Sequence, residues 1–462
     1  MHINEFKTQK IIDRPNDVYL IIFTICFILI GASALIFDIA WALVLSGIAL
    51  SLVILMRPFW GLLLFTMVLP LESSYLSLGG GVATITRLLG IFIFGAWLIN
   101  VIINRIKISF PKILYITFSL IFWSVISVLW AYDKSVALGR VQTAIQLAML
   151  LFLVVNLINN EKRLKALISA LFFGCLIIIL LGLTRIGVAD NYTLLALGGQ
   201  GAKEYGSFVG VVFLIGSILM FFEKGFRRWF GFLSVLISMI TLIQVNQRGV
   251  LLGIGAAWLS VTIITKQKFK TIFLILLLLL LFNFSIDILF NRGVINESLV
   301  SRLTVENVIE TGGTGRSEIW RTGWRMFTDN LILGVGINNF SVVYHKYVTG
   351  NGQSQFRYPH SDVITIAGEL GVVGVIFYLY FIIKMVLDIY FLLERSEKFQ
   401  GNLIVIIGFS LLIYYFSVGL TSTLIWRKIN WVVYGIGIAM PFLLANNNII
   451  EGQNKSYVID GE

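Results

Sequence analysis

The chain has 462 residues, of which 58% are hydrophobic and only 13% are charged. Soluble domains contain about 45–50% apolar and about 25% charged residues. This composition, with a mean hydropathy of +0.91, therefore excludes an ordinary soluble domain and indicates a membrane protein. The formal net charge is +11. Basic loops on one side of a membrane explain such a charge, so we expect no nucleic-acid partner.

Apolar segments long enough to cross a bilayer recur along the whole chain. A hydrocarbon core of ~30 Å needs about 20 apolar residues in a helix, and helices satisfy their own backbone hydrogen bonds within lipid. The sequence therefore predicts an all-α polytopic membrane protein with about 12–14 transmembrane helices. The predicted spans are roughly 18–37, 39–56, 59–71, 84–103, 113–131, 138–158, 164–185, 205–222, 230–246, 249–265, 270–290, 362–384, 402–422 and 429–446.

Basic residues alternate between loops and predict the orientation of the chain. Every second loop is rich in Lys or Arg, and the positive-inside rule assigns such loops to the cytoplasm. We therefore expect a multi-pass protein of the cytoplasmic (inner) membrane with both termini in the cytoplasm. The predicted parts are an N-terminal transmembrane bundle, one large extracytoplasmic loop with amphipathic helices, and C-terminal transmembrane helices with a short cytoplasmic tail, at residues 1–290, 291–360 and 361–462.

The extracytoplasmic loop contains a predicted amphipathic helix at residues 317–330. Its aromatic residues recur at helical spacing, with arginines beside them. Aromatic and Arg side chains suit the lipid headgroup layer. The helix therefore either rests on the bilayer or directs Arg316 toward a phosphate. The residues of this face are Trp320, Trp324 and Phe327, with Arg321 and Arg325 alongside.

A glycine-rich turn and a histidine follow this helix. Gly334 and Gly336 mark a tight turn, and Pro359 precedes a new helix that Ser361 can cap. This order places His360 at the outer mouth of the 362–384 span. A lone histidine at an interface is usually structural. Because imidazole titrates near neutral pH, His360 also suits a general base or a hydrogen-bond partner of a phosphate oxygen.

Three arginines lie at or near the outer membrane surface. Arg140 opens the 138–158 span, Arg248 lies between two spans, and Arg316 lies in the loop. A cation at membrane depth costs about 2.5–3.5 kcal/mol on insertion scales and usually marks a functional site. A guanidinium also binds phosphate through two parallel hydrogen bonds. The alternative interpretations are a snorkelling loop charge for Arg248 and a structural role for Arg140.

Taken in order, these motifs resemble the O-antigen ligase and O-antigen polymerase superfamily of bacterial inner membranes. Members of that superfamily have a late periplasmic loop with a Gly-Arg…Trp element, a Gly-x-Gly-x-x-x-Phe turn and a His-Asn/Ser motif, followed by Glu-x-Gly-x-x-Gly. The resemblance covers residues 245–375, and Ser361 stands where Asn is common. The matching residues are Arg248 and Gly249; Gly315, Arg316 and Trp320; Gly334, Gly336 and Phe340; His360 and Ser361; Glu369, Gly371 and Gly374.

The resemblance implies a C-type glycosyltransferase-like fold and a metal-independent, inverting enzyme without a cofactor. The donor would be a glycan on undecaprenyl diphosphate, and the acceptor would be a lipid A-core sugar or a lipid-linked repeat unit. Arg248 and Arg316 would bind the donor and stabilise the leaving diphosphate. His360 would activate the acceptor hydroxyl or bind the leaving phosphate. Further candidates for substrate binding are Arg140, Arg321 and Glu369.

Two other classes are consistent with a multi-span chain. A flippase or transporter of lipid-linked sugars would place ionisable residues mid-span and show inverted repeats, and the sequence shows neither pattern. A peptidoglycan polymerase of the shape-determining or sporulation type also has a large outer loop, but the order of the His360 and Glu369 motifs argues against it. Ligase and polymerase stay open alternatives, because both transfer a glycan to a sugar.

Overall fold

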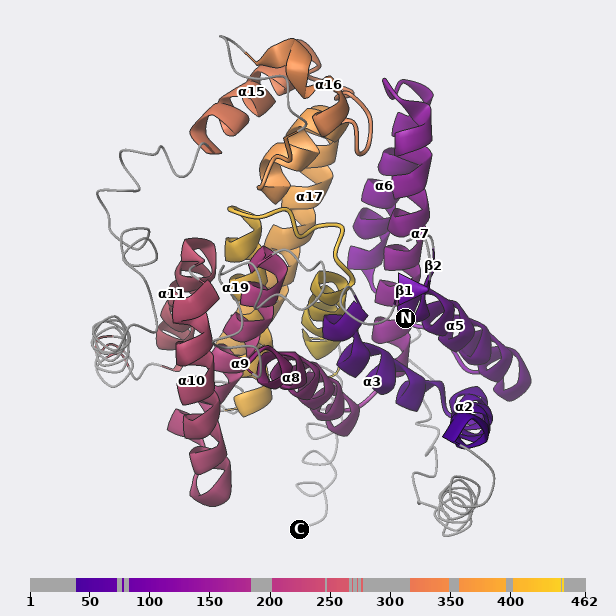
Figure 1. Ribbon diagram of the computed structural model, residues 1–462, viewed down its shortest axis with the longest axis vertical. Coiled ribbons are helices and arrows are strands. Elements are labelled where there is room, and N and C mark those ends of the chain that lie inside the picture. Colours follow the sequence, from indigo (N-terminus) through magenta and orange to yellow (C-terminus); the bar gives the residue numbers. More distant parts are fainter. Residues whose placement is uncertain are drawn as a thin grey trace, which may run out of the picture.

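Figure 1 shows the computed structural model, a bundle of helices with two short helices at one end. The predicted span 18–37, most of the predicted span 270–290, and residues 291–315 of the loop lie outside the described residues. The structure describes residues 39–72, 77–78, 83–183, 202–245, 247–265, 316–348, 357–395, 402–441 and 443, with single positions at 268, 272 and 276.

The described residues confirm an all-α polytopic membrane fold. Seven of their helices are long and apolar enough to cross a membrane, and four shorter apolar helices accompany them. The total of about 12–14 spans stays a prediction. These eleven helices are α2 (Ile39–Met56), α3 (Pro58–Val68), α5 (Ile85–Asn104), α6 (Lys112–Ile126), α7 (Lys134–Leu157), α8 (Glu161–Leu183), α9 (Ala202–Phe222), α10 (Gly225–Val245), α11 (Arg248–Thr265), α17 (Asp362–Arg395) and α19 (Leu403–Gly419). A further helix at 428–441 follows them in the chain.

Short elements connect or cover these helices. Two helices from the predicted loop, α15 (Arg316–Asp329) and α16 (Phe340–Tyr347), pack on α17. Two 3-10 turns, η1 (Leu69–Leu71) and η2 (Ser127–Leu129), extend α3 and α6. Strands β1 (Ser77–Leu78) and β2 (Ala83–Thr84) form one antiparallel pair before α5.

Helix α17 is longer than the predicted span 362–384, because it continues to Arg395. The prediction ended where Lys384 and Asp388 interrupt the apolar run. In the structure these two side chains form an ion pair one helical turn apart. Such i,i+4 pairs support a helix through a polar stretch, so the charges do not end α17.

Helix α9 lies at the centre of the bundle and packs against α8, α10, α11 and α19. Small residues allow its closest approach to α10: a Cβ on Gly231 would lie 2.7 Å from the backbone nitrogen of Met220. Without a hydrophobic driving force in lipid, such close backbone packing holds membrane helices together. The Tyr414 hydroxyl of α19 adds a hydrogen bond of 2.9 Å to the Ser207 carbonyl oxygen of α9.

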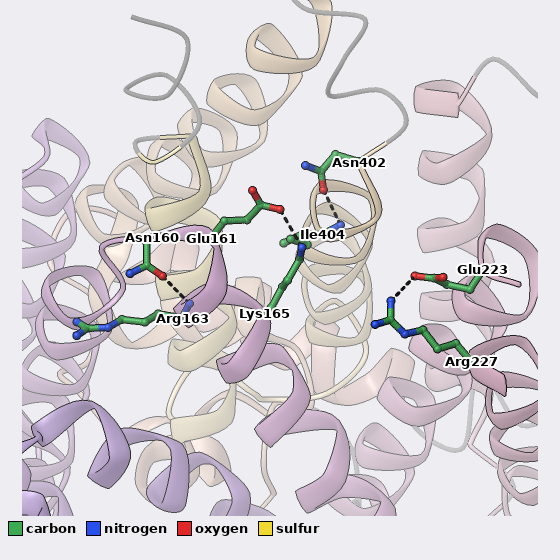
Figure 2. A network of polar contacts seen from close by, with 8 residues as sticks. All are labelled: Asn160, Glu161, Arg163, Lys165, Glu223, Arg227, Asn402 and Ile404. Atoms are coloured by element: carbon green, nitrogen blue, oxygen red, sulfur yellow. Dashed lines mark hydrogen bonds and ion pairs between the residues drawn. The ribbon is translucent and has the colours of Figure 1, made fainter. Parts of the chain in front are cut away.

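The bundle has two chemically different ends. We call the end that carries α15, α16 and the start of α17 the loop end (Figure 1). Figure 2 shows polar contacts at helix termini elsewhere in the bundle, where the sequence predicts the cytoplasmic side. There Lys165 pairs with Glu161 at 3.1 Å and Arg227 pairs with Glu223 at 3.2 Å. Asn402 caps α19 through the backbone nitrogen of Ile404 at 3.0 Å.

Candidate active site

The predicted amphipathic helix exists as α15, and it buries a face of small and apolar residues. Trp324 is 58% exposed, whereas Met326 is fully buried beside Phe340 in a small apolar cluster. The aromatic face was assigned to the lipid headgroup layer, which stays a prediction. The opposite side packs closely on α17, because a Cβ on Gly323 would touch the Ile364 side chain. The buried residues of α15 are Ile319, Thr322, Gly323 and Met326.

Helix α17 is kinked at Gly371, whose φ of 66° and ψ of −165° are not helical. Glycine adopts a positive φ without a steric penalty. Contact also requires it, because a Cβ here would lie 2.5 Å from the carbonyl carbon of Ile332. Gly334, with a φ of 68°, faces the kink from the other side, and a Cβ on it would lie 2.5 Å from the Leu370 nitrogen. The sequence motifs that contain Gly334 and Gly371 therefore pack directly against each other.

At the kink, backbone carbonyl oxygens of α17 accept hydrogen bonds from backbone N–H groups of the glycine-rich turn. The Gly368 oxygen accepts from the Val335 nitrogen at 3.0 Å, and the Glu369 oxygen accepts from the Gly336 nitrogen at 2.9 Å. The indole nitrogen of Trp123, on α6, donates to the Leu370 oxygen at 2.9 Å. Buried carbonyl groups need such partners. The turn is thus bonded to α17 through its main chain.

The Glu369 carboxylate holds the next part of the turn. The side chain is only 4% exposed. It accepts a hydrogen bond of 2.8 Å from the Asn338 nitrogen and another from the Phe340 nitrogen. Arg140 of α7 interacts with the Glu369 charge and donates to the Asn338 side-chain oxygen from Nε at 3.2 Å and from Nη2 at 2.9 Å. A buried acid and a basic residue from a distant helix therefore meet at Asn338.

The same turn is tied to the α6–α7 connection. The Ile337 nitrogen donates to the Ser127 hydroxyl at 3.0 Å. Asn339 is fully buried; its side-chain oxygen accepts from the Asp133 nitrogen at 2.6 Å, and its side-chain nitrogen donates to the Asp133 oxygen at 3.2 Å. Asp133 also caps α7 by accepting from the Ser135 nitrogen at 2.9 Å. Such an N-cap fixes the start of the helix that carries Arg140.

Helix α15 contacts the segment that carries His360. The indole nitrogen of Trp320 donates to the Pro359 oxygen at 3.0 Å. Arg316 lies one turn earlier on the same face of the helix, because residues four apart are neighbours. His360 has a φ of 51° and is partly exposed. A non-glycine residue in this left-handed region is uncommon and often occurs where a side chain is aimed for function.

Asp362, the first residue of α17, connects His360 to the turn at 420–427. Its Oδ1 atom accepts from the Leu424 nitrogen at 2.6 Å and from the Ile425 nitrogen at 2.8 Å. The residue is 1% exposed, and Oδ2 has no hydrogen-bond partner within the described part of the chain. The carboxylate therefore fixes the 420–427 turn two residues from His360.

The 420–427 turn also contacts the start of α11. A Cβ on Gly249 would overlap the Thr421 hydroxyl, so only glycine fits there without movement. Arg248, the first residue of α11, is thus adjacent to the turn. The turn continues to Arg427, whose Nη1 lies 3.2 Å from Glu204 Oε1 on α9. Helices α11, α15 and α17 all begin in this region, with Arg248, Arg316 and Asp362 as their first residues.

The structure brings the predicted site residues together in two groups and leaves Arg321 apart from both. Arg248, Arg316 and His360 lie on elements joined through the 420–427 turn and the Pro359 contact. Arg140 and Glu369 meet at the glycine-rich turn. Arg321 is exposed and pairs with Glu318 at 3.2 Å on α15.

Sequence reasoning missed the residues that support this arrangement. Asn338 has a φ of 60°, and asparagine is enriched in that conformation. An Asn-Asn pair one residue after Gly-x-Gly could have indicated a structured turn. Asp133, in front of a predicted span, fits the N-cap preference. The partners of Asp362 lie about sixty residues away in sequence, at Leu424 and Ile425, and no local pattern identifies them.

Comparison with known protein families identifies the region around this site. Residues 232–379 match the family described as O-antigen ligase. Over these residues the chain is similar to the O-antigen ligase family, which supports the O-antigen ligase and polymerase superfamily. The matched O-antigen ligase region contains Arg248, Arg316, His360 and Glu369, and Arg140 lies outside it. No curated protein matches the chain.

The match supports the resemblance drawn from the motifs and an activity of the ligase or polymerase type. It also agrees with the multi-pass membrane fold. Within the described residues, no group of three or more His, Cys, Asp and Glu side chains could hold a metal ion. The dependence of the reaction on metal stays open to experiment.

Proposed function

We propose that the protein transfers a glycan from undecaprenyl diphosphate to a sugar hydroxyl on the outer face of the cytoplasmic membrane. The observation that carries this proposal is the convergence of three helix starts at the loop end. Two of those helices begin with an arginine, at Arg248 and Arg316, and the third begins beside His360. The O-antigen ligase family match over residues 232–379 supports the reaction class.

A diphosphate leaving group fits the charge at this place. The N-terminus of a helix carries about half a positive charge and free N–H groups, which bind anions. Arg248 and Arg316 add a guanidinium to the first turns of α11 and α15. Together they would stabilise the negative charge that develops as the glycosidic bond breaks. We propose that this charge stabilisation requires no divalent metal.

His360 is proposed to act on the acceptor. In support of this role, His360 has a left-handed backbone conformation, and Asp362, two residues further on, bonds to the 420–427 turn. A neutral imidazole would take the proton of the attacking sugar hydroxyl while that oxygen displaces the diphosphate from the anomeric carbon. Backside attack inverts that carbon. General base catalysis of this kind contributes about 10²–10⁴-fold in rate.

Arg140 and Glu369 are proposed to act through the turn rather than on the substrate. Glu369 accepts from the backbone of Asn338 and Phe340, and Arg140 donates to the side chain of Asn338. Both groups thus hold the turn between α15 and α16. Arg321, exposed on α15, is left as a candidate contact for the sugar part of a substrate or for lipid headgroups.

The arginine roles are tested by paired substitutions in cells. Arg316→Ala is expected to abolish surface polysaccharide formation and let lipid-linked donor accumulate, while the protein still inserts at normal levels. Arg316→Lys keeps the charge but loses the two-pronged hydrogen bonding, so it should restore only part of the activity. Arg227→Ala, in an exposed ion pair with Glu223 at the predicted cytoplasmic side, is the matched control. Near-normal polysaccharide in both Arg248→Ala and Arg316→Ala would refute the charge-stabilisation proposal.

A further inference from the structure

The 420–427 turn ends with a partly exposed arginine, Arg427. Its Nη1 atom lies 3.2 Å from Glu204 Oε1, and 52% of the side chain is exposed. Among the residues that the structure describes, Glu204 is its only ion-pair partner. A guanidinium has five N–H donors in a planar fork, and one carboxylate accepts from two of them at most. Arg427 therefore keeps donors that an anionic ligand can use.

The main chain around Arg427 is held on both sides. The Arg427 nitrogen donates to the Leu424 oxygen at 2.8 Å, and the Arg427 oxygen accepts from the Asn430 nitrogen at 3.1 Å. The indole nitrogen of Trp431, which is 1% exposed, donates to the Ile425 oxygen at 2.6 Å. A fixed backbone lowers the entropy that is lost when a side chain binds a ligand. The turn is therefore suited to present the guanidinium.

Arg427 also links the two groups of candidate site residues. Arg140, which is held by the glycine-rich turn, interacts electrostatically with Arg427 and with Tyr358. Tyr358 is 64% exposed and lies two residues before His360. The Arg140 side chain is therefore near the 420–427 turn and near the segment that carries the histidine. The two groups adjoin at Arg140 and Arg427.

The charges of Arg140 and Arg427 repel each other. Such repulsion is stronger near a protein surface than in bulk water, because the effective dielectric constant is lower. Each arginine interacts with one carboxylate of its own, Glu369 for Arg140 and Glu204 for Arg427. An anion that binds between the two arginines would be attracted by both of them. The exposed half of Arg427 leaves it accessible to such a ligand.

The position of the 420–427 turn indicates which anion this is. The turn contacts Gly249, next to Arg248, and it bonds to Asp362, two residues after His360. It thus borders the proposed donor site. In the proposed reaction, the anion at this site is the diphosphate of the donor. A diphosphate has several acceptor oxygens and more than one negative charge, so it can bind more than two guanidinium groups.

We propose that Arg427 is a third guanidinium of the diphosphate site, beside Arg248 and Arg316. Glu204 holds the Arg427 side chain in place for this contact. The inference rests on the proposed function and adds a residue of the 420–427 turn to the donor site. Arg140 is a fixed charge next to it, because its guanidinium already bonds to the glycine-rich turn.

The test is binding of a polyprenyl diphosphate without a sugar to the full-length protein in phosphatidylcholine nanodiscs. Because the probe has no sugar, a change in its Kd reports on contacts with the lipid diphosphate. Arg427→Gln should raise this Kd about 10–100-fold, the effect of losing hydrogen bonds between charged groups. Arg227→Gln is the matched control, because Arg227 forms an ion pair of 3.2 Å with Glu223 at the predicted cytoplasmic side. It should leave the Kd within about twofold.

Glu204→Gln separates ligand binding from a purely structural ion pair. It removes the charge of the carboxylate and keeps the shape of the side chain. Arg427→Gln and Glu204→Gln lose the same ion pair, so they should lower the thermal unfolding temperature by similar amounts. Glu204→Gln should nevertheless raise the Kd of the probe by no more than about threefold. Equal losses of binding in the two variants would give Arg427 only a structural role and overturn the inference.

Two further arms complete the binding test. Arg427→Lys keeps the charge opposite Glu204 and loses the planar fork, so it should unfold like the wild-type protein and raise the Kd about 3–10-fold. This variant tests the inference even if Arg427→Gln folds poorly. A wild-type Kd in either Arg427 variant would overturn the inference. Excess phosphatidylglycerol should not displace the probe; displacement would identify a general anionic-lipid surface and also overturn it.

Transfer assays on the same proteins separate this inference from the proposed function. If the wild-type protein transfers glycan and Arg316→Ala does not, while Arg427→Gln binds the probe normally, the proposed function stands and the inference fails. If the wild-type protein forms no glycan product while the Kd of the probe still depends on Arg427, the proposed function fails and the diphosphate contact of Arg427 stands.

Discussion

Replacement of Glu369 tests how the glycine-rich turn is held. The carboxylate accepts two backbone hydrogen bonds, from Asn338 at 2.8 Å and from Phe340, and it faces Arg140. Hydrogen bonds to a charged group contribute about 1.5–3 kcal/mol each. Glu369→Ala should therefore lower the free energy of unfolding by about 3–6 kcal/mol. Glu369→Gln keeps one acceptor oxygen without its charge, so roughly half of that loss is expected.

The two variants should affect turnover more than donor binding. If Glu369 acts through the turn, Glu369→Gln should lower kcat about 10–100-fold, because a displaced group near the reacting atoms costs orientation. The Kd for donor should stay within about twofold, since this change is under 0.5 kcal/mol. The measurements are unfolding by SDS titration in detergent and donor binding alongside transfer kinetics.

A matched control is available elsewhere in the bundle. Glu223 pairs with Arg227 at 3.2 Å in an exposed i,i+4 pair, so Glu223→Gln should cost less than about 0.5 kcal/mol. Loss of donor binding in Glu369→Gln with unchanged stability would refute the supporting role. It would return Glu369 to direct substrate contact.

Three further predictions concern topology, the histidine and metal. A reporter that is active only outside the cytoplasm should be active when fused near Asn351 and inactive near Lys268; the reverse pattern would overturn the placement of the site. His360→Gly should fold at least as stably as His360→Ala, because glycine suits the φ of 51° at this position. Both variants should nevertheless lose about 10²–10⁴-fold in turnover. Thermal unfolding and transfer assays test this, and an active His360→Gly enzyme would leave the histidine with a structural role. Chelator should leave the transfer rate unchanged, and a strict requirement for added divalent metal would contradict charge stabilisation by Arg248 and Arg316.

Hydropathy predicted the membrane helices well, because lipid demands long apolar helices whatever their neighbours are. The span expected at 84–103 is α5 at Ile85–Asn104. The prediction was weaker where charges pair within a helix, as at Lys384 and Asp388. Hydropathy gave no prediction of which face of α15 packs on protein, because that face is set by small residues packing on α17.

The sequence proposes a set of candidate site residues but not how they are arranged. The order of glycines around Gly334 and Gly371 pointed to one family, yet the sequence does not show that the two motifs pack on each other across a kink. The link from Asp362 to Leu424 and Ile425 depends on how distant helices meet. Local patterns carry no information about such contacts, so the supporting residues emerge only from the fold.

The most direct measurement is product formation by the purified protein with only two substrates present. The wild-type chain, reconstituted with a polyprenyl diphosphate-linked glycan and a glycan acceptor in the presence of chelator, should release polyprenyl diphosphate and form the lengthened glycan. His360→Ala should bind the donor and form almost no product. A wild-type protein that forms no product but moves the lipid-linked glycan between leaflets would contradict the transferase and identify a flippase.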